Sequence, residues 1–531
     1  MGNPINPSTG LKFQVETDYR SPAGLEFTRI YHSLATDKET LDGSLGTGGW
    51  RFNWQRSVQA VSNPIVSQLR SLGMDTGSGS GGVNAPYGMT VHRLGYAIPL
   101  CSAPTFGVAN AIRGEGNVYT FNKQSSGVWT SDVDVNDQLN RQTDATGNVQ
   151  GWTYITADHD VEKYDVTGKL LSVTTRAGQT TTLTYSDGTA VAPNGGVISG
   201  TTTALPAGLL IRITDAHQHR LNLGYDEQSR IIKMTDPANG AYSYTYDTAG
   251  NLTSVTYPDG KTKHYLYENT TYIHALTGIT DENGTRFATY AYDSNGRAIS
   301  TEHAGGAERA AITYNTGSSN ITDALGTVRT QTYQIVQGAT KITGVSQPGG
   351  SGCGASASNQ TYDTNGNVAS RTDFKGNKTC YAYDLTRNLE VVRLEGVASS
   401  ASCPTTLSTY VPSTATGSVE RKNTTTWNAT YRLPLQIAEP LLLTTYTYDT
   451  KGNLLTRTVQ PTTDATGGAG LAAVADPNSQ PRTSSYTYYT TTDARKSLLK
   501  TVNGPRTDVT DVTSYNYDTT TGNLTTVTNA L

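Results

Sequence analysis

The stretch YSYTYDTAGNLTSVTYPDGKTKHYLY, residues 242–267, decides the fold of this chain. Its centre, Asp247-Thr248-Ala249-Gly250, is typical of a hairpin turn, because Asp bonds backbone N–H groups two residues on and Gly tolerates a positive φ. A type I turn that ends in a left-handed Gly commonly closes a β-hairpin. We therefore expect a strand at Leu252–Tyr257, a second turn at Pro258–Lys261 and a further strand at Thr262–Tyr267.

The same pattern, Tyr-Asp-x-x-Gly-(Asn/Arg/Lys)-apolar, recurs along the chain. Its copies begin with Tyr164-Asp165-x-x-Gly168, Tyr246-Asp247-x-x-Gly250, Tyr292-Asp293-x-x-Gly296, Tyr362-Asp363-x-x-Gly366 and Tyr448-Asp449-x-x-Gly452, and the last, Tyr517-Asp518 with Gly522, has one extra residue. Degenerate copies keep Tyr-Asp but lose Gly, at Tyr225-Asp226 and Tyr383-Asp384. Successive copies lie about 21 residues apart, which suits two strands and two short turns.

Tyrosines two residues apart, such as Tyr244 and Tyr246, share one face of a strand. Stacked in register they would form tyrosine ladders across neighbouring strands. Such ladders usually serve packing or line a shell, and stacking against sugars is the alternative function. The Tyr-Asp pairs are interpreted as structural rather than catalytic, because an acid–base pair is not needed ten times over. We therefore predict an all-β fold, a long curled antiparallel sheet of hairpins, and no enzymatic activity.

Composition excludes several classes of protein. Charged residues make up 16% of the chain and the net charge is −4, so the clustered basic residues of nucleic-acid-binding proteins are missing. Tyr contributes 32 residues and Gly 54, and Thr is more abundant still, which favours strands and turns. No run approaches the length of a transmembrane helix. The N-terminus also lacks the pattern of a signal peptide.

Other chemical motifs are weak. Asp75-Thr76-Gly77 matches the aspartic protease triplet only as text, because no apolar strand precedes it. His217-Gln218-His219 would put two imidazoles on one strand face, but a third metal ligand is not near in sequence. The four cysteines, Cys101, Cys353, Cys380 and Cys403, fit no zinc spacing, and one bridge among the last three stays open. No cofactor or metal is expected.

The first 160 residues lack the regular repeat and are predicted to form a separate β-rich domain. Alternation predicts strands at Phe13–Tyr19, Glu26–Tyr31, Asn117–Asn122 and Gly151–Ala157. Four of the five tryptophans lie here, so we expect a compact module with its own core, as a plug or cap on the sheet. Residues 161–531 would form the repeat sheet, interrupted by loops near Gln347–Asn359, Ser399–Gly417 and Pro461–Pro481.

The repeat resembles the YD repeat of the Rhs and wall-associated protein family. The N-terminal segments Asn3–Gly10, Phe27–Ser33 and Leu45–Trp50 are similar to the domain that precedes the repeats in bacterial Rhs proteins, and Val161–Asp165 resembles the junction with the first repeat. The resemblance covers essentially the whole chain. It implies a β-strand shell, a cocoon that encloses a C-terminal toxin. The autoproteolysis signature and the toxin are not found here, so we expect a shell that is incomplete at its C-terminal end.

The resemblance also implies partners and a place of action. We expect the chain to be a non-catalytic scaffold of a polymorphic toxin, with a C-terminal toxin domain or the remaining shell as partner. A type VI secretion spike or another delivery apparatus would be a second partner. The protein would then be secreted, surface-bound or translocated to a target cell. The alternative function is a surface adhesin or carbohydrate-binding repeat protein, whose partners would be glycans.

Overall fold

The computed structural model of the chain describes residues 4–21, 24–34, 43–61, 107–350, 352 and 354–530. The described residues form β-strands joined by turns and loops, with two short 3-10 helices, η1 (Ala304–Gly306) and η2 (Gly470–Ala472). Within those ranges the chain has no helix that is long and apolar enough to cross a membrane. The predicted all-β fold is confirmed. The Asp75-Thr76-Gly77 triplet, Cys101 and Cys353 lie outside the described residues.

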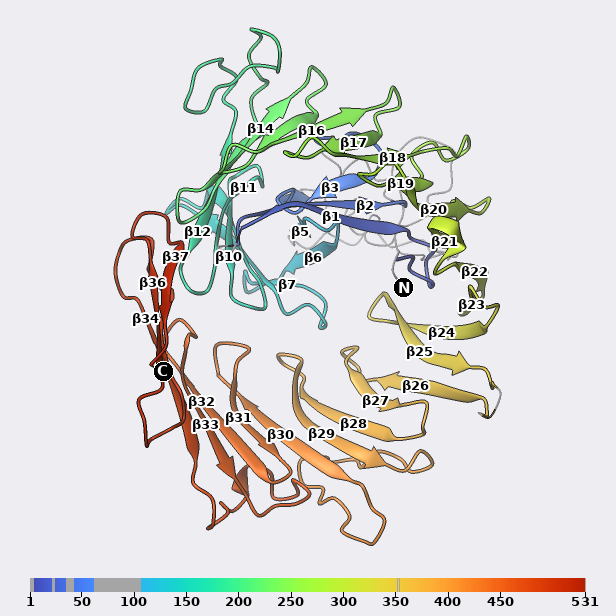
Figure 1. Cartoon of the computed structure of the whole chain (residues 1–531), viewed down its shortest axis with the longest axis vertical. Coiled ribbons are helices and arrows are strands. Elements are labelled where there is room, and N and C mark those ends of the chain that lie inside the picture. The colour runs from blue at the N-terminus through green and yellow to red at the C-terminus, as the bar shows by residue number, and fades with distance from the viewer. Residues whose placement is uncertain are drawn as a thin grey trace. The chain divides into compact units, whose positions relative to one another are not determined.

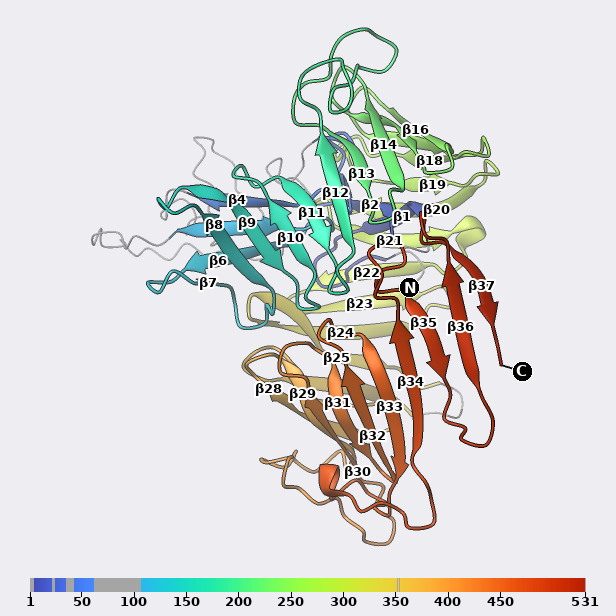
Figure 2. The ribbon, with the colours of Figure 1, turned by 90° about the vertical axis from the view of Figure 1, so that its left-hand side faces the viewer.

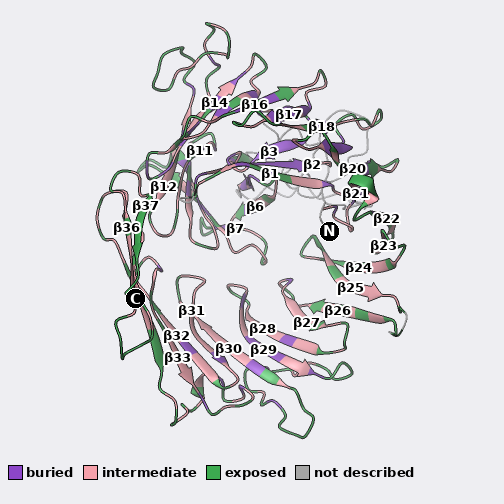
Figure 3. Cartoon of the chain, viewed as in Figure 1, coloured by how far each residue is buried: buried purple, intermediate pink, exposed green. Residues whose placement is uncertain are grey.

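Two small sheets come first in the chain (Figure 1). The first has the order β1-β2-β3 and the second the order β4-β5-β6-β7. Their bounds are β1 Phe13–Arg20, β2 Glu26–His32, β3 Trp50–Phe52, β4 Ser57–Val61, β5 Val108–Ile112, β6 Val118–Lys123 and β7 Trp129–Thr130. Figure 3 shows β2 and β3 largely as buried, in agreement with their burial patterns.

The remaining strands belong to a long antiparallel sheet in which each strand pairs with the next along the chain, as β12, β13 and β14 do in Figure 2. The predicted sheet of consecutive hairpins is therefore confirmed. Its earlier strands are β8 Gln138–Thr143, β9 Val149–Ile155, β10 Val161–Tyr164, β11 Leu170–Thr174, β12 Thr180–Tyr185, β13 Leu210–Thr214, β14 Arg220–Tyr225, β15 Ile231–Thr235, β16 Ala241–Tyr246, β17 Leu252–Thr256, β18 Thr262–Leu266, β19 Gly278–Thr280, β20 Arg286–Tyr292, β21 Ala298–His303, β22 Ala310–Asn315 and β23 Ser318–Asp323.

The later strands continue the same order. They are β24 Val328–Val336, β25 Ala339–Gln347, β26 Ser356–Tyr362, β27 Val368–Thr372, β28 Lys378–Asp384, β29 Leu389–Val397, β30 Arg421–Trp427, β31 Pro434–Glu439, β32 Leu442–Tyr448, β33 Leu454–Pro461, β34 Arg482–Tyr488, β35 Leu499–Asn503, β36 Val512–Tyr517 and β37 Leu524–Thr528. Long loops separate β29 from β30 and β33 from β34, where the sequence predicts interruptions.

The chain divides into two compact units, which we describe separately. Unit 1 comprises Met1–Tyr154, Glu162–Val173 and Thr181–Arg329, and unit 2 comprises Ile155–Val161, Thr174–Thr180 and Thr330–Leu531. The domain boundary near residue 160 stays a prediction. In unit 1, one hydrophobic cluster joins Trp50, Phe121 and Trp152 of the N-terminal part to Leu221 and Tyr244 of the repeats. The expected separate core is therefore wrong, because the aromatic side chains of both parts pack together.

Several exposed or part-exposed threonines bond to each other across neighbouring strands. Examples are Thr245 with Thr253 at 2.9 Å, Thr256 with Thr262 at 2.8 Å and Thr447 with Thr456 at 2.6 Å between hydroxyl oxygens. Such cross-strand pairs stabilise a sheet and leave the opposite face to larger side chains. The abundance of Thr thus has a structural explanation.

Candidate functional site

The motif turn is a closed hydrogen-bonded loop. At Asp247, the carbonyl oxygen accepts from the N–H of Gly250 at 3.1 Å, and the Asp247 N–H donates to the carbonyl of Asn251 at 3.0 Å. Carboxylate oxygen Oδ1 accepts from the N–H of Asn251 at 2.8 Å and Oδ2 from its side-chain amide at 2.9 Å. Gly250 has φ 83°, the left-handed conformation that Gly adopts without steric cost. The register shifts at Tyr246, which lies opposite Leu252.

The other predicted motif residues occupy equivalent places. The glycine N–H donates to the aspartate carbonyl in Asp165–Gly168, Asp293–Gly296, Asp363–Gly366, Asp449–Gly452 and Asp518–Gly522. The extra residue of the last copy widens that turn, since Asp518 N–H reaches Asn523. In the degenerate copy, Ser229 takes the place of Gly with φ 62°. Burial alone would raise the pKa of Asp449, but hydrogen bonds from Asn453 and from backbone N–H groups hold it below its ordinary value.

The motif tyrosine ties each hairpin to the one before it. The hydroxyl of Tyr225 donates to the carbonyl of Leu210 at 2.7 Å, and that of Tyr246 to the carbonyl of Ile231 at 2.7 Å. The same bond recurs from Tyr185, Tyr292, Tyr314, Tyr362, Tyr383, Tyr448 and Tyr488. The acceptor lies in an earlier strand in every case except Leu276, the acceptor for Tyr292, which lies just before β19. Sequence reasoning missed this bond, although the roughly constant spacing of Tyr from the preceding apolar residue is a signal for it.

The residue after the motif glycine often covers the next tyrosine. The Nζ of Lys169 lies 4.8 Å from the ring centre of Tyr185, and the guanidinium of Arg230 lies 4.5 Å from that of Tyr246. Such cation–ring contacts are favourable by about 0.5–1 kcal/mol at partly exposed sites. They explain why Lys or Arg alternates with Asn at this position.

The N-terminal segment of unit 1 docks on the motif turns. Val58 N–H donates to the carbonyl of Gly168 at 2.9 Å, and Thr47 N–H donates to the carbonyl of Gly250 at 3.0 Å. Immediately after two further turns, Ile231 N–H donates to the carbonyl of Ser44 at 2.7 Å and Ala298 N–H to the carbonyl of Gly10 at 2.9 Å. Four turns spread along the repeats thus hold one N-terminal segment.

Close approach explains why glycine is needed at these docking points. A Cβ on Gly168 would lie 1.7 Å from the carbonyl oxygen of Val58, and one on Gly250 would lie 2.6 Å from the hydroxyl of Thr47. Both distances are too short for any side chain. The motif glycines of unit 1 therefore serve the hairpin turn and the docking of the N-terminal segment together.

A buried polar cluster lies where the N-terminal segment meets the tyrosine face of unit 1. Arg29 donates to both carboxylate oxygens of Asp18, at 2.6 and 2.8 Å, and to the hydroxyl of Tyr265 at 3.0 Å. Tyr244 donates to the same Asp18 at 2.8 Å, and Trp50 packs on Tyr265 with ring centres 4.8 Å apart. Burial and the Asp18 charge raise the pKa of Tyr244 well above its ordinary value. The Tyr244 hydroxyl therefore stays protonated near neutral pH.

Unit 2 presents tyrosines that are only half-buried. Tyr381 and Tyr383 stack with ring centres 6.4 Å apart, and so do Tyr446 and Tyr448. In unit 1, by contrast, Tyr244 is 3% exposed. Another contact within unit 2 involves Arg176, which lies 5.4 Å from the ring centre of Tyr431 and donates to the carbonyl of Gly452 at 3.3 Å.

The histidine motif and the cysteines complete the predicted sites. His217 and His219 lie in the turn between β13 and β14 rather than on a strand face, so that expectation is wrong. The reason is local: Gln218, with φ 67°, takes the place of the motif glycine, and Nδ1 of His219 bonds Oδ2 of Asp215 at 2.9 Å.

Cys380 and Cys403 form a disulfide. In the described part of the chain, no three His, Cys, Asp or Glu side chains gather as a metal site.

These turns, repeated along one antiparallel sheet, define a repeat protein of the YD type. Two families match parts of the chain: RHS Repeat over residues 225–262 and Domain of unknown function (DUF6531) over residues 2–71. The matched segments are thus similar to an RHS repeat and to an N-terminal DUF6531 domain. No curated protein sequence matches it.

Several solved structures are similar to the chain. TcdB2-TccC3 without its hypervariable C-terminal region is 12% identical with a TM-score of 0.39, over 97% of this chain and 22% of that one. TcdB2-TccC3-Cdc42 is 13% identical with a TM-score of 0.36, over 80% and 26%. The Photorhabdus luminescens Tc holotoxin pore is 11% identical with a TM-score of 0.33, over 96% and 26%. The chain thus spans about a quarter of the length of these solved chains.

Proposed function

We propose that this chain is the non-catalytic shell portion of an Rhs-type polymorphic toxin. Its sheet would help to enclose and deliver a toxin domain, and a secretion spike or another delivery apparatus would recognise the protein. The observation that carries the proposal is the pair of tyrosine faces. In unit 1 the N-terminal segment covers this face, whereas in unit 2 tyrosines such as Tyr381 and Tyr446 are half-buried. We propose that the toxin polypeptide contacts the face of unit 2.

The disulfide supports an extracytoplasmic stage for the protein. Disulfides persist in oxidising compartments and are rare where thiols are kept reduced. Cys380 is fully buried, and Leu394 and Leu407 pack in the same small cluster. The bridge ties the loop after β29 to strand β28 across a separation of 23 residues. We therefore propose that the protein is exported or displayed at the cell surface.

Protection from protease tests the shell. A lysine-rich unstructured tail of about 100 residues, fused after Leu531 of the full chain, serves as the passenger. We expect trypsin to cleave it at least ten times more slowly than the same tail on an unrelated globular protein. Equal cleavage rates would exclude an enclosing role for this chain.

The half-buried tyrosines of unit 2 also favour one alternative, an adhesin that binds glycans by ring stacking. Binding of the chain to a glycan array distinguishes the two functions. An adhesin requires binding that is lost in Tyr381→Ala and Tyr446→Ala. The shell function predicts no such binding, while the tail in the protease assay stays protected.

A further inference from the structure

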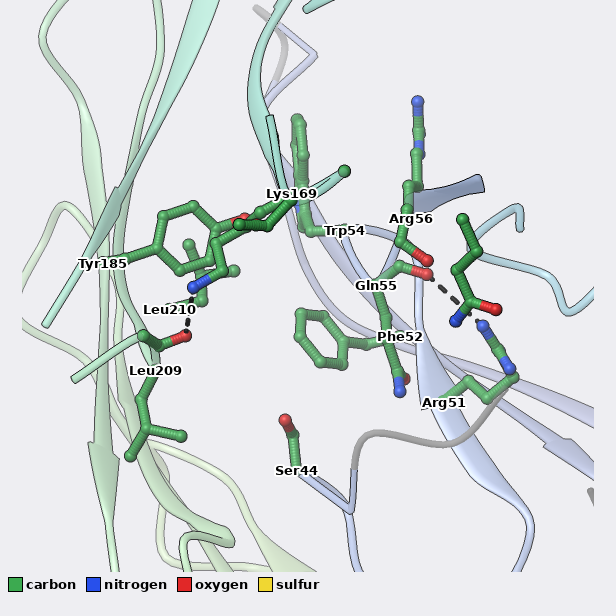
Figure 4. A pocket seen from close by; sticks show the side chains of 15 residues that line it. Ser44, Arg51, Phe52, Trp54, Gln55, Arg56, Lys169, Tyr185, Leu209 and Leu210 are labelled. Atoms are coloured by element: carbon green, nitrogen blue, oxygen red, sulfur yellow. Dashed lines mark hydrogen bonds between the residues drawn. The ribbon is translucent and has the colours of Figure 1, made fainter. Parts of the chain in front are cut away.

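A cavity of about 420 Å³ lies in unit 1, where the N-terminal segment meets the first repeats (Figure 4). One wall comes from Ser44 and from residues 51, 52 and 54–57, and the other from residues 167–169, Tyr185 and Leu210. Cavities of this size accommodate small organic ligands. The contact of Val58 with Gly168 closes the junction beside it.

The cavity has apolar walls. Phe52 is 2% exposed and Trp54 is 7% exposed, and both line it together with Tyr185 and Leu210. Aromatic and branched side chains of this kind hold a flat or branched apolar group by packing and by removing its surface from water.

Its charged lining residues are all basic. Lys169, Arg51 and Arg56 line the cavity, whereas none of the described lining residues is acidic. Lys169 uses one of its three N–H donors on the carbonyl of Gly208 at 3.2 Å, and Figure 4 shows its amino group beside Tyr185. Its remaining donors can serve an incoming anion.

The acids behind the cavity do not cancel this charge. Glu162 binds both Arg56 and Arg113, at 2.5 and 2.6 Å. Asp165 turns its carboxylate to the backbone N–H groups of Thr167 and Lys169, at 2.8 and 2.9 Å. Among these residues, Arg56 and Arg113 thus share the one carboxylate of Glu162. Burial and the positive charge of Arg51 also lower the pKa of His32 to about 4.

We propose that this cavity binds an organic carboxylate with an aromatic or branched body. Lys169 holds the carboxylate, and Phe52 and Trp54 hold the body. An N-acylated aromatic amino acid and the carboxyl end of a peptide both have this chemistry. The bound ligand bridges the N-terminal segment and the first repeats. The inference is independent of the shell function.

Calorimetry on the full chain tests the site with N-acetyl-L-tryptophan and with its uncharged amide. We expect the acid to bind at least ten times more tightly than the amide, and Lys169→Gln to lose at least tenfold in affinity for the acid. Lys375→Gln, at an exposed turn of unit 2, should bind like the wild type. A hexapeptide that ends in tryptophan distinguishes the two kinds of ligand. If the peptide binds more tightly than N-acetyl-L-tryptophan, the ligand is the carboxyl end of a peptide, and if it binds more weakly, the ligand is a free acid.

Three results would overturn the site: no binding of either the acid or the peptide, equal affinity for acid and amide, or unchanged affinity in Lys169→Gln. The comparison of acid and amide uses the wild-type chain, so it remains decisive even if the Lys169 variant folds poorly.

Discussion

The glycines that end the hairpin turns meet two demands that differ from one turn to the next. Gly168 and Gly178 both end turns with positive φ, at 84° and 88°. Only Gly168 is also approached by another segment, through the carbonyl of Val58, whereas a Cβ on Gly178 would meet nothing within 4 Å. A comparison of these two positions therefore separates the need for a left-handed φ from the need for space beside the N-terminal segment.

Replacement of each glycine by alanine measures the two demands. Gly178→Ala should cost about 1 kcal/mol, because only the left-handed conformation is strained. Gly168→Ala should cost a further 1–3 kcal/mol or so, because the methyl group displaces the N-terminal segment. Chemical denaturation of both variants gives the comparison. Equal losses would mean that the N-terminal segment does not dock on this turn.

The motif tyrosine contributes a hydrogen bond as well as a ring. Tyr225→Phe removes only the hydroxyl that reaches Leu210, so it should cost about 1 kcal/mol of unfolding free energy. Tyr486→Phe, on the half-buried face of unit 2, is the control and should change stability by less than about 0.5 kcal/mol. A loss in Tyr486→Phe as large as that in Tyr225→Phe would contradict a specific role for the hydroxyl bond.

Among the elements, β1 and β2 carry a buried ion pair between Asp18 and Arg29. Both side chains of the Arg29–Asp18 pair are fully buried, whereas in the neighbouring Arg20–Glu26 pair the Arg20 side chain is 66% exposed. Removing one partner of a buried pair leaves an uncompensated charge, and exposed pairs contribute little.

Asp18→Asn should therefore destabilise the chain by about 3–5 kcal/mol. Arg20→Ala should cost less than about 1 kcal/mol. Thermal unfolding followed by circular dichroism measures both. Similar melting temperatures for the two variants would show that β1 and β2 do not pack on the tyrosine face.

The sequence predicts the hairpins well but not the contacts between distant segments. Asp247 and Gly250 encode their turn locally, through bonds within five residues, so the pattern alone reveals it. The contact of Val58 with Gly168 spans more than a hundred residues and depends on folding of the whole unit. The expected strand position of His219 failed because Gln218 adopts a positive φ without being glycine. The shared core was missed because aromatic composition does not show which partners pack together.

At the scale of the whole molecule, the aspartates of the turns make the stability of the fold depend on pH. Hydrogen bonds from Thr146 and Asn148 lower the pKa of Asp144 to about 2, and the pKa values of Asp165, Asp373 and Asp449 are also below their ordinary value. A carboxyl whose pKa is depressed on folding adds stability above its unfolded pKa, and this stability is lost as pH falls through the folded pKa.

We therefore expect the melting temperature to hold down to about pH 4 and to fall steeply between about pH 4 and pH 2. The Asp449→Asn variant should have a lower melting temperature than the wild type at pH 6. Its melting temperature should fall less on acidification, because one of the titrating groups is gone. Melting curves across this range test the expectation. A melting temperature that does not change down to pH 2 would contradict it.

Accessibility of the tyrosines tests the central claim most directly, namely that the tyrosines of unit 1 are buried under the N-terminal segment whereas those of unit 2 are half-buried. Iodination of the native chain, read by mass spectrometry, should spare Tyr225, Tyr244 and Tyr265, which are at most 3% exposed. It should modify Tyr381, Tyr446 and Tyr515, which are half-buried. Equal modification of the two sets in the folded chain would contradict the account.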